Sequence, residues 1–572
     1  MKKRILSLCT ALLLIFALAS PALAAAPESD PIIMIAGYTS TQLFANPDSD
    51  GRVQVWNPDF NQIALELVKE LPGLLGGGAI YAVSGWEKMI VDAFARAADR
   101  ALGKFTMNAD GTRAHDVGPW PGGAKDFSLA VIRSKYDKDH LLPNGAQNLM
   151  QLSSFCKRFE QQVGTENIFI FQYEWRDPTL MTVEKLRAFI QEVKQLTGSR
   201  KVRIFGSSYG GQITGAYLHD YAAKGDVSRV VMEFPALGGS SMIPAMLTGE
   251  GFGVQAEAFT RFVQSYMDTE TKLDPILKGL DLSKLYPLVT ALLQGGIKPV
   301  AVTWGSLWDL VPANQYEATK KAVLGPGEHY AWEKYCDRMH REIMPNIGKT
   351  LKNAQKVHGI EIRIVANTGS PHLVGPNTIN SDGLLDVQYT TGAKALPLGG
   401  HGIKRSNTNC ANAKHAHVSP GQDIDASAAW LPENTWFVQG QYHGASYLDP
   451  YALDLESALM LDPDLDTVRD DPAFPQFGLC RQPSECIAAG FDGKALKIDN
   501  LSKERGVKLL SLRADGLAFE SLPGRKLKPG ESASIACTKS KAGGALTAVT
   551  VRYYEYNGII PILRTKAFDF TL

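Results

Sequence analysis

The chain has 572 residues, of which 45% are hydrophobic, so it can form a large folded domain and a smaller one, and global disorder is excluded. Its 59 Lys and Arg residues balance its 59 Asp and Glu residues. This zero formal net charge excludes the basic excess that a nucleic-acid-binding domain needs, and we expect no nucleic-acid partner.

Residues 1–26 have the pattern of a secretory signal peptide. A basic start, Lys2-Lys3-Arg4, precedes an apolar segment from Ile5 to Leu18, and Ala22-Leu23-Ala24 supplies a small-x-small cleavage site. The alternative is an uncleaved anchor, but the apolar segment is short and is followed by Pro21. No later segment is long and apolar enough to span a bilayer. We expect an exported protein, secreted or held at the cell surface.

Six cysteines lie beyond this leader, and an even number in an exported chain permits three disulfides. Their pairing does not follow from the sequence, although Cys480 and Cys486 are close enough to close a small loop and are expected to pair first. The six are Cys156, Cys336, Cys410, Cys480, Cys486 and Cys537.

Strands and helices alternate over residues 27–465, which predicts an α/β domain with a parallel sheet. Residues 104–125, rich in Gly, Pro and polar groups, are expected to form a surface excursion. The expected strands are 31–36, 53–56, 168–175, 202–205, 229–234, 362–366 and 435–438, and the expected helices are 60–72, 84–103, 181–196, 451–461 and one that begins near 216.

Two further segments complete the predicted organisation. Residues 238–358 lack clear strands and carry amphipathic helices, so they are expected to form a cap or lid, with most of their aromatic residues packed in its core. Residues 466–490, rich in Pro and Asp, are expected to be a linker, and residues 491–572 a small β-sandwich.

A candidate nucleophile lies between a predicted strand and a predicted helix. Gly206-Ser207-Ser208-Tyr209-Gly210 fits G-x-S-x-G, in which small residues allow a tight corner that exposes the Ser208 hydroxyl. Backbone N–H groups after the serine can face an oxyanion, and a second donor is expected beside Gly37, where the first strand ends. The alternative for residues 206–210 is an ordinary Gly/Ser turn, and the alternative for Gly37 is a plain strand-to-loop turn.

A serine of this kind needs a base and an orienting acid, which follow it in the order acid, then histidine. Asp382 is the preferred acid because Asp-Gly makes a tight loop, and Asp386 is the second choice; either could instead be a solvated turn residue. His443 is the expected base because it follows a predicted strand and precedes a helix. His401, His415 and His417 lie in a long polar segment and are expected at the surface, with no metal site.

These motifs together resemble the lecithin:cholesterol acyltransferase family, which includes lysosomal phospholipase A2 and phospholipid-dependent diacylglycerol acyltransferases. The resemblance spans about Pro31 to Leu461 and excludes the C-terminal β-domain. Its segments are Ile35–Ala45, Tyr173-Glu174-Trp175-Arg176, Ser207–Gly211, Phe234–Ser240, Ser381–Leu385 and His443. Ser207 stands where the family usually has His.

The resemblance implies an α/β-hydrolase fold with lid insertions, a Ser208-Asp382-His443 triad, and oxyanion N–H groups from Tyr38 and Tyr209. We therefore expect a secreted serine esterase, without a cofactor, that acts on lipid acyl esters such as phospholipid or acylglycerol. Its acyl-serine intermediate would pass to water or to an alcohol, with transient contact at a membrane or lipid-particle surface. The alternatives are a noncatalytic binding protein on a hydrolase scaffold and a serine peptidase, which the apolar insertions disfavour.

Overall fold

The computed structural model describes two compact units, divided after Cys480, and each is treated by itself. The predicted signal peptide, the predicted helix at 60–72, nearly all of that at 84–103 and residues 251–297 of the predicted cap lie outside the described residues. The described residues are 29–56, 102–135, 147–250, 298–373, 379–404, 417–480, 487–491, 494–500, 506–514, 517–519, 525–528, 530–539, 546–557 and 560–571.

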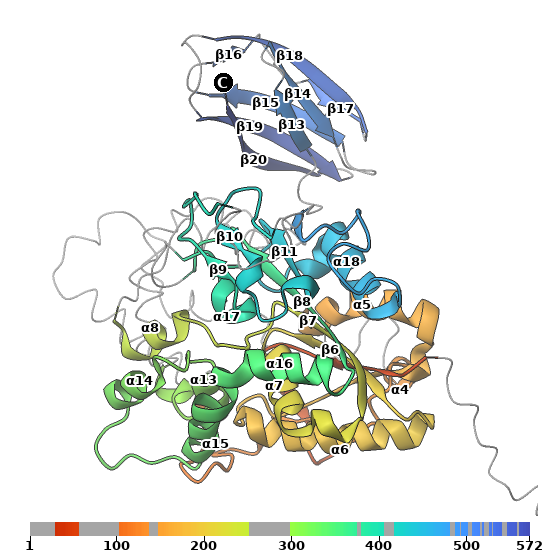
Figure 1. Cartoon of the computed structure of the whole chain (residues 1–572), viewed down its shortest axis with the longest axis vertical. Coiled ribbons are helices and arrows are strands. Elements are labelled where there is room, and N and C mark those ends of the chain that lie inside the picture. The colour runs from red at the N-terminus through yellow and green to blue at the C-terminus, as the bar shows by residue number, and fades with distance from the viewer. Residues whose placement is uncertain are drawn as a thin grey trace, which may run out of the picture. The chain divides into compact units, whose positions relative to one another are not determined.

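The first unit is built on a seven-stranded sheet in which every neighbouring pair is parallel (Figure 1). Six of its strands match the predicted ones. The seventh, β12, lies at one edge and inside the segment predicted as a linker, so the first unit extends beyond residue 465. In spatial order the strands are β12 (Phe477–Leu479), β11 (Thr435–Gln439), β8 (Glu361–Thr368), β7 (Val227–Glu233), β6 (Val202–Ser207), β1 (Ile32–Ile35) and β5 (Ile168–Ile170).

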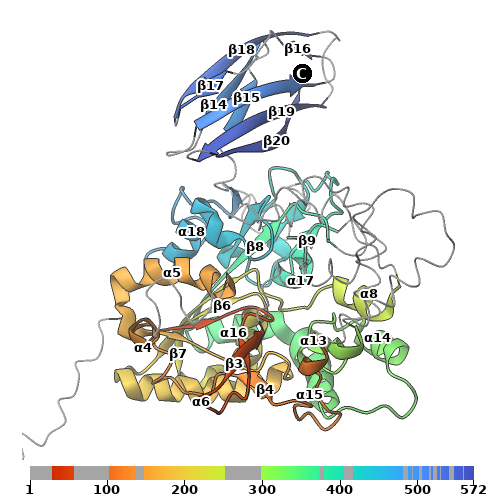
Figure 2. The same ribbon diagram turned by 180° about the vertical axis from the view of Figure 1, so that it is seen from behind.

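Both faces of the sheet are covered by helices, because its central strands are apolar at consecutive positions. Ile33 and Ile35 belong to one hydrophobic cluster, and Ile32 and Met34, which point the other way, belong to a second. Figures 1 and 2 show the covering layers. Helices α6 (Thr179–Thr197), α7 (Tyr209–Tyr221) and α16 (Ile347–Lys356) cover one face, and α5 (Gln147–Val163) and α18 (Pro450–Leu461) cover the other.

Two sequence-based expectations in this unit were only partly right. The predicted surface excursion at 104–125 is exposed over most of 108–116, but it also supplies buried side chains, including Phe105 and Val117. Its strand β4 (Val117–Pro119) pairs with β2 (Leu43–Ala45), which also pairs with β3 (Val53–Trp56). The predicted strand at 168–175 ends at Ile170 as β5, because its partner β1 ends at Ile35 and the chain turns away.

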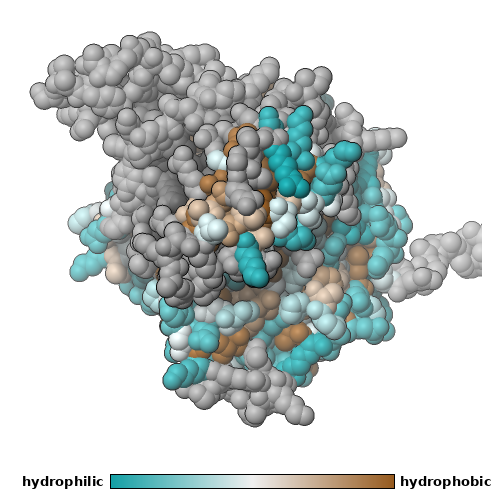
Figure 3. Space-filling view, turned by 90° about the horizontal axis from the view of Figure 1, so that it is seen from above, coloured by the Kyte–Doolittle hydropathy of each residue, from teal (hydrophilic) through white to brown (hydrophobic). Residues whose placement is uncertain are grey.

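The described part of the predicted cap, 238–250 and 298–358, contains helices and packs against the sheet's helices. Its tryptophans Trp304, Trp308 and Trp332 are buried in the first hydrophobic cluster, as expected of core residues. The helices preceding α16 are α8 (Met242–Thr248), α12 (Lys298–Ala301), α13 (Gly305–Asp309), α14 (Tyr316–Val323) and α15 (Glu333–Arg338). No helix within the described ranges is long and apolar enough to cross a membrane. On the face in Figure 3, hydrophobic and hydrophilic residues are interspersed.

The cysteines do not form the three disulfides that their number permits. Cys156 and Cys336 are buried thiols without a disulfide, and burial raises the pKa of the Cys156 thiol to about 12. Cys486 lies outside the described residues, so its pairing with Cys480 stays a prediction.

The second unit consists of two antiparallel sheets around a core of its own, which fits the predicted β-sandwich. One sheet contains β13 (Ile487–Phe491), β14 (Ala495–Asn500), β18 (Ser532–Lys539) and β16 (Leu517–Phe519). The other contains β17 (Lys526–Leu527), β15 (Gly506–Arg513), β19 (Leu546–Asn557) and β20 (Ile560–Thr571). Buried aliphatic residues such as Ile498, Leu509 and Val551 fill the core.

Candidate active site

Ser208 lies in a strained turn between β6 and α7, with φ of 54° and ψ of −116°. Positive φ is uncommon for a residue with a side chain. Two backbone contacts hold the turn: the Ser208 amide donates to the carbonyl of Glu233 at 2.9 Å, and the Ser208 carbonyl accepts from the amide of Gly211 at 2.9 Å. This is the strand-turn-helix corner that the G-x-S-x-G pattern predicts.

The two glycines of that pattern are required by close backbone contacts. A Cβ on Gly210 would lie 2.2 Å from the carbonyl oxygen of Ile35, at the end of β1. A Cβ on Gly206 would lie 2.8 Å from the Thr214 hydroxyl and 2.9 Å from the Gly210 carbonyl. Only glycine therefore allows α7 to begin this close to the end of the sheet.

The side chains of Ser208, His443 and Asp382 form a hydrogen-bonded chain. Ser208 Oγ lies 2.9 Å from His443 Nε2, and His443 Nδ1 lies 2.7 Å from Asp382 Oδ2. Asp382 is buried, and its other oxygen accepts from the amides of Leu384 at 2.9 Å and Leu385 at 2.7 Å. The Asp382 carbonyl also accepts from the His443 amide at 2.8 Å, so the acid and base loops are joined through backbone as well.

Asp386, the second choice for the acid, is directed away from His443. Its carboxylate accepts from the amide and hydroxyl of Ser241 at 2.9 and 2.8 Å, and it lies 3.5 Å from Nε2 of His372. Burial acts to raise the pKa of the Asp386 carboxyl, but the neighbouring His372 and the hydrogen bonds from Ser241 outweigh it and hold that pKa below its usual range. Asp386 therefore anchors the loop that presents Asp382.

The predicted oxyanion donors lie on either side of the nucleophile. Tyr209 directly follows Ser208 at the start of α7, and Gly37 approaches so closely that a Cβ on it would lie 3.0 Å from Ser208 Cβ. Within the described part of the chain, neither the Tyr38 amide nor the Tyr209 amide donates a backbone hydrogen bond. Both amides are therefore candidate donors to an ester oxyanion formed on Ser208.

Two residues near the triad were not singled out from the sequence. Glu233 is buried at the end of β7, in register with Ser207 of β6, and desolvation raises the pKa of its carboxyl. The next residue, Phe234, has φ of 30° and its ring packs 4.6 Å from the His443 ring. Phe234 begins one of the segments that carry the family resemblance, but nothing in its composition marks a contact with the base.

Of the other histidines considered above, neither of the two within the described residues is brought to this site. His401 is exposed, as expected, and His415 lies outside the described residues. The expectation for His417 was wrong: it is buried, 2.7 Å from Gln476 Oε1 and 3.1 Å from Glu433 Oε1. Backbone pairing holds it there, because its carbonyl accepts from the Ala426 amide and Val418 pairs with Asp425. In the described ranges, no group of three or more His, Cys, Asp or Glu side chains is arranged to hold a metal ion.

Comparison with known proteins finds no matching protein-family model and no matching curated protein. Among solved structures, the chain is similar to phospholipase PlaB from Legionella pneumophila, with 12% identity, a TM-score of 0.24 and coverage of 74% of this chain and 86% of that chain. It is also similar to Bacillus licheniformis lipase BlEst2 in its propeptide form, with 9% identity, a TM-score of 0.22 and coverage of 72% and 88%. At these scores the likeness carries no argument about substrate or mechanism.

The fold therefore follows from the chain's own topology. Seven parallel strands are covered on both faces by helices, a serine follows β6 in a strained corner, and an acid and a histidine follow β8 and β11. This arrangement and chain order define the architecture, because open parallel α/β sheets place their sites at the carboxyl ends of their strands. The first unit has an α/β-hydrolase fold.

Proposed function

We propose that the protein is an exported serine esterase that acts on lipid acyl esters. The observation that carries this proposal is the continuous hydrogen-bonded path from Ser208 through His443 to the buried Asp382. A buried carboxylate fixes the imidazole with Nδ1–H toward Asp382, which makes Nε2 the acceptor of the serine proton. The hydrogen-bonded path together with the nearby amides of Tyr38 and Tyr209 favours a catalytic protein over a noncatalytic binding protein on the same scaffold.

The reaction begins when Ser208 Oγ attacks the ester carbonyl and its proton passes to His443 Nε2. The carbonyl oxygen becomes an oxyanion, which accepts hydrogen bonds from the amides of Tyr38 and Tyr209. His443 then gives the proton to the leaving alcohol, and an acyl-Ser208 ester remains. In the second half, His443 takes a proton from water, or from an acceptor alcohol, while that oxygen attacks the acyl carbonyl and forms a second tetrahedral intermediate. The bond between the acyl carbon and Ser208 Oγ then breaks, His443 returns the proton to Oγ, and the acid or the new ester is released.

The lipid substrate class is supported by the resemblance to the lecithin:cholesterol acyltransferase family, whose motif segments surround this site. Tyr173, Trp175 and Ser240 come from those segments, and all three are buried. The signal-peptide pattern supports action outside the cytoplasm, at a membrane or lipid-particle surface. Water is the proposed acceptor because no residue in the site specifies an alcohol, and no cofactor enters the reaction.

The test compares the mature chain with Ser208→Ala on fluorescent phospholipid, acylglycerol and peptide substrates. Ester hydrolysis by Ser208→Ala should fall about 10⁴-fold or more, because nucleophile, base and acid act as one unit. Ser134→Ala, an exposed serine on helix α4 (Leu129–Lys135), is the control and should match the parent.

The outcomes separate the candidate functions. Hydrolysis of lipid esters alone supports the proposal, whereas cleavage of peptides alone favours a serine peptidase. Fluorophosphonate labelling that persists in Ser208→Ala, or equal ester hydrolysis by that variant and the parent, contradicts the assignment of Ser208. Release of acylated alcohol when an alcohol is added would identify transfer rather than hydrolysis.

A further inference from the structure

The Gly37–Tyr38 peptide, whose N–H is the proposed second oxyanion donor, lies in a strained turn. The Ser40 amide donates to the Gly37 carbonyl at 3.2 Å, and Thr39, a β-branched residue, has φ of 60° between them. This φ is unfavourable for threonine, so the turn depends on contacts from outside it. One is the Trp56 indole, which donates to the Thr39 carbonyl at 2.8 Å.

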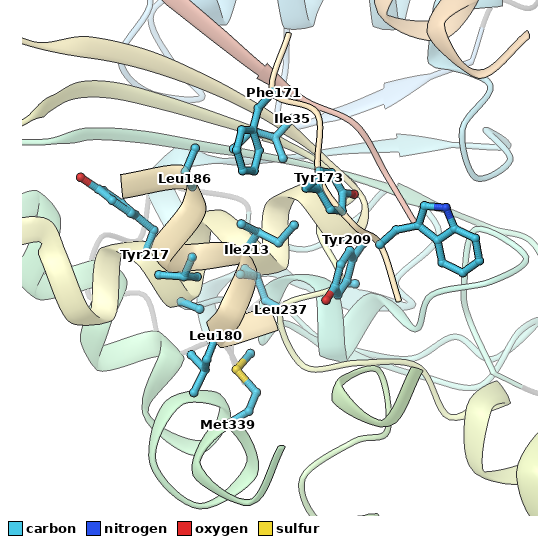
Figure 4. Packing of buried hydrophobic residues seen from close by; sticks show 14 of the residues in the cluster. Ile35, Phe171, Tyr173, Leu180, Leu186, Tyr209, Ile213, Tyr217, Leu237 and Met339 are labelled. Atoms are coloured by element: carbon cyan, nitrogen blue, oxygen red, sulfur yellow. The ribbon is translucent and has the colours of Figure 1, made fainter. Parts of the chain in front are cut away.

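The other contact comes from Tyr173, which follows β5. Its hydroxyl lies 2.7 Å from the Ala36 carbonyl oxygen and 2.9 Å from the Gly37 carbonyl oxygen, so its single proton is shared between two consecutive peptides. Figure 4 shows the Tyr173 ring beside the Tyr209 ring, and their centroids are 6.2 Å apart. Tyr173 therefore reaches the Gly37–Tyr38 peptide from within the hydrophobic core.

We propose that Tyr173 is a positioning residue for the oxyanion hole, acting through the Gly37–Tyr38 peptide. This inference rests on the proposed function. A trans peptide is planar, so its C=O and N–H point in opposite directions, and no described peptide bond is cis. A hydroxyl that holds the Gly37 carbonyl therefore also fixes the direction of the Tyr38 N–H, at a point where a Cβ on Gly37 would lie 3.0 Å from Ser208 Cβ.

The hydroxyl is suited to this role because it stays protonated and fixed. Burial raises the pKa of the Tyr173 phenol, with a further rise from neighbouring Tyr38, so it remains a donor across the working range of an esterase. The residues that follow anchor it. Arg176 is paired with Glu174 at 2.7 Å and donates to the Phe105 carbonyl at 3.2 Å.

The adjoining aromatic rings fix the other end of the same peptide. The Tyr38 ring packs edge-on against Trp175 and against Tyr209, with centroids 5.6 Å apart in both cases. The segment Tyr173-Glu174-Trp175-Arg176 thus uses its first and third side chains to hold the oxyanion loop. Its second and fourth form the ion pair that holds the segment itself.

The test is Tyr173→Phe, which removes one oxygen and keeps the ring. Removing an oxyanion donor outright costs about 10²–10³ in rate, and a loosened peptide should cost less, so we expect kcat to fall about 10- to 100-fold with KM within about twofold. Affinity for a trifluoromethyl ketone, which forms a tetrahedral oxyanion on Ser208, should fall by the same factor as kcat. A purely structural role would lower the unfolding midpoint without this matched loss.

The matched control is Tyr217→Phe on α7, which removes another buried hydroxyl for which no hydrogen-bond partner is found among the described residues. It should keep the parent's kcat and ketone affinity. Because Phe keeps the buried ring of Tyr173, kcat and ketone affinity are compared with the parent at a temperature below the variant's own unfolding midpoint. A folded Tyr173 variant with the parent's kcat overturns the inference while Ser208→Ala remains inactive. Activity that persists in Ser208→Ala instead overturns the proposed function.

Discussion

Replacing Asp382 and Asp386 in turn by asparagine distinguishes the proposed catalytic acid from the acid that anchors its loop. In Asp382→Asn the amide oxygen can keep the bonds from Leu384 and Leu385, which Oδ1 now accepts at 2.9 and 2.7 Å. Its NH₂ group then faces His443 Nδ1 at the 2.7 Å contact now made by Oδ2. Two donors cannot face each other, so the imidazole takes the tautomer with Nδ1 as acceptor and Nε2–H toward Ser208.

The cost follows from that change of tautomer. With Nε2 protonated, His443 cannot accept the serine proton, and an asparagine in this position of a serine-histidine-acid triad lowers kcat by about 10⁴. This equals about 5 kcal/mol of lost transition-state stabilisation. In Asp386→Asn the contacts to Ser241 and His372 weaken instead, which should lower the free energy of unfolding by about 2 kcal/mol and leave kcat of the folded chain near the parent's.

The assay is hydrolysis of a soluble chromogenic ester by both variants and the parent, with thermal unfolding measured on the same samples. Asp382→Asn should be folded and nearly inactive, and Asp386→Asn should be less stable and active. A kcat for Asp382→Asn within about tenfold of the parent, together with a large loss of kcat in folded Asp386→Asn, would refute the assignment of the acid.

Two further variants probe the surroundings of the nucleophile. Gly210→Ala places a Cβ 2.2 Å from the Ile35 carbonyl oxygen, so it should lower the unfolding free energy by about 3 kcal/mol or more and reduce activity. The control is Gly51→Ala, whose Cβ would meet nothing closer than 3.8 Å and which should have little effect in the same unfolding assay. Glu233→Gln tests a buried carboxyl whose pKa is raised by burial. The folded parent holds this proton to higher pH than the unfolded chain, so the parent's free energy of unfolding falls as pH rises above about 4. The unfolding midpoint of Glu233→Gln minus that of the parent should therefore increase from about pH 4 to about pH 8. A midpoint difference that shrinks over that range would contradict the reasoning.

The sheet and the three hydrogen-bonded side chains could be predicted because each has a local signal. Strand-forming apolar runs precede Ser208 and His443, and Asp382 stands in an Asp-Gly turn after another such run. The choice between Asp382 and Asp386 remained open in the sequence because both lie in the right interval. Tertiary contacts separate them: one meets His443 and the other meets Ser241.

Other features were hidden because they depend on long-range packing. Residues 104–125 are rich in turn formers, yet Phe105 and Val117 pack into the first hydrophobic cluster, and their carbonyls accept from Arg176 at 3.2 and 2.6 Å. Strand β12 is short and sits between Pro- and Asp-rich stretches, so only its pairing with β11 reveals it. Local composition alone does not predict such long-range contacts.

The strand order explains why residues so distant in the sequence meet. Strands β1, β6, β7, β8 and β11 are consecutive neighbours in one parallel sheet, so their carboxyl ends share one edge. Tyr38, Ser208, Glu233, Asp382 and His443 each follow or end one of these strands. A new chemistry on this edge would require changes only in the loops, whereas the contacts of Tyr173 and Gly210 with the end of β1 tie the proposed oxyanion hole to the sheet itself. The position of the proposed oxyanion donors is therefore the part of the site that loop variation can alter least, while the loops that carry Asp382 and His443 can vary around it.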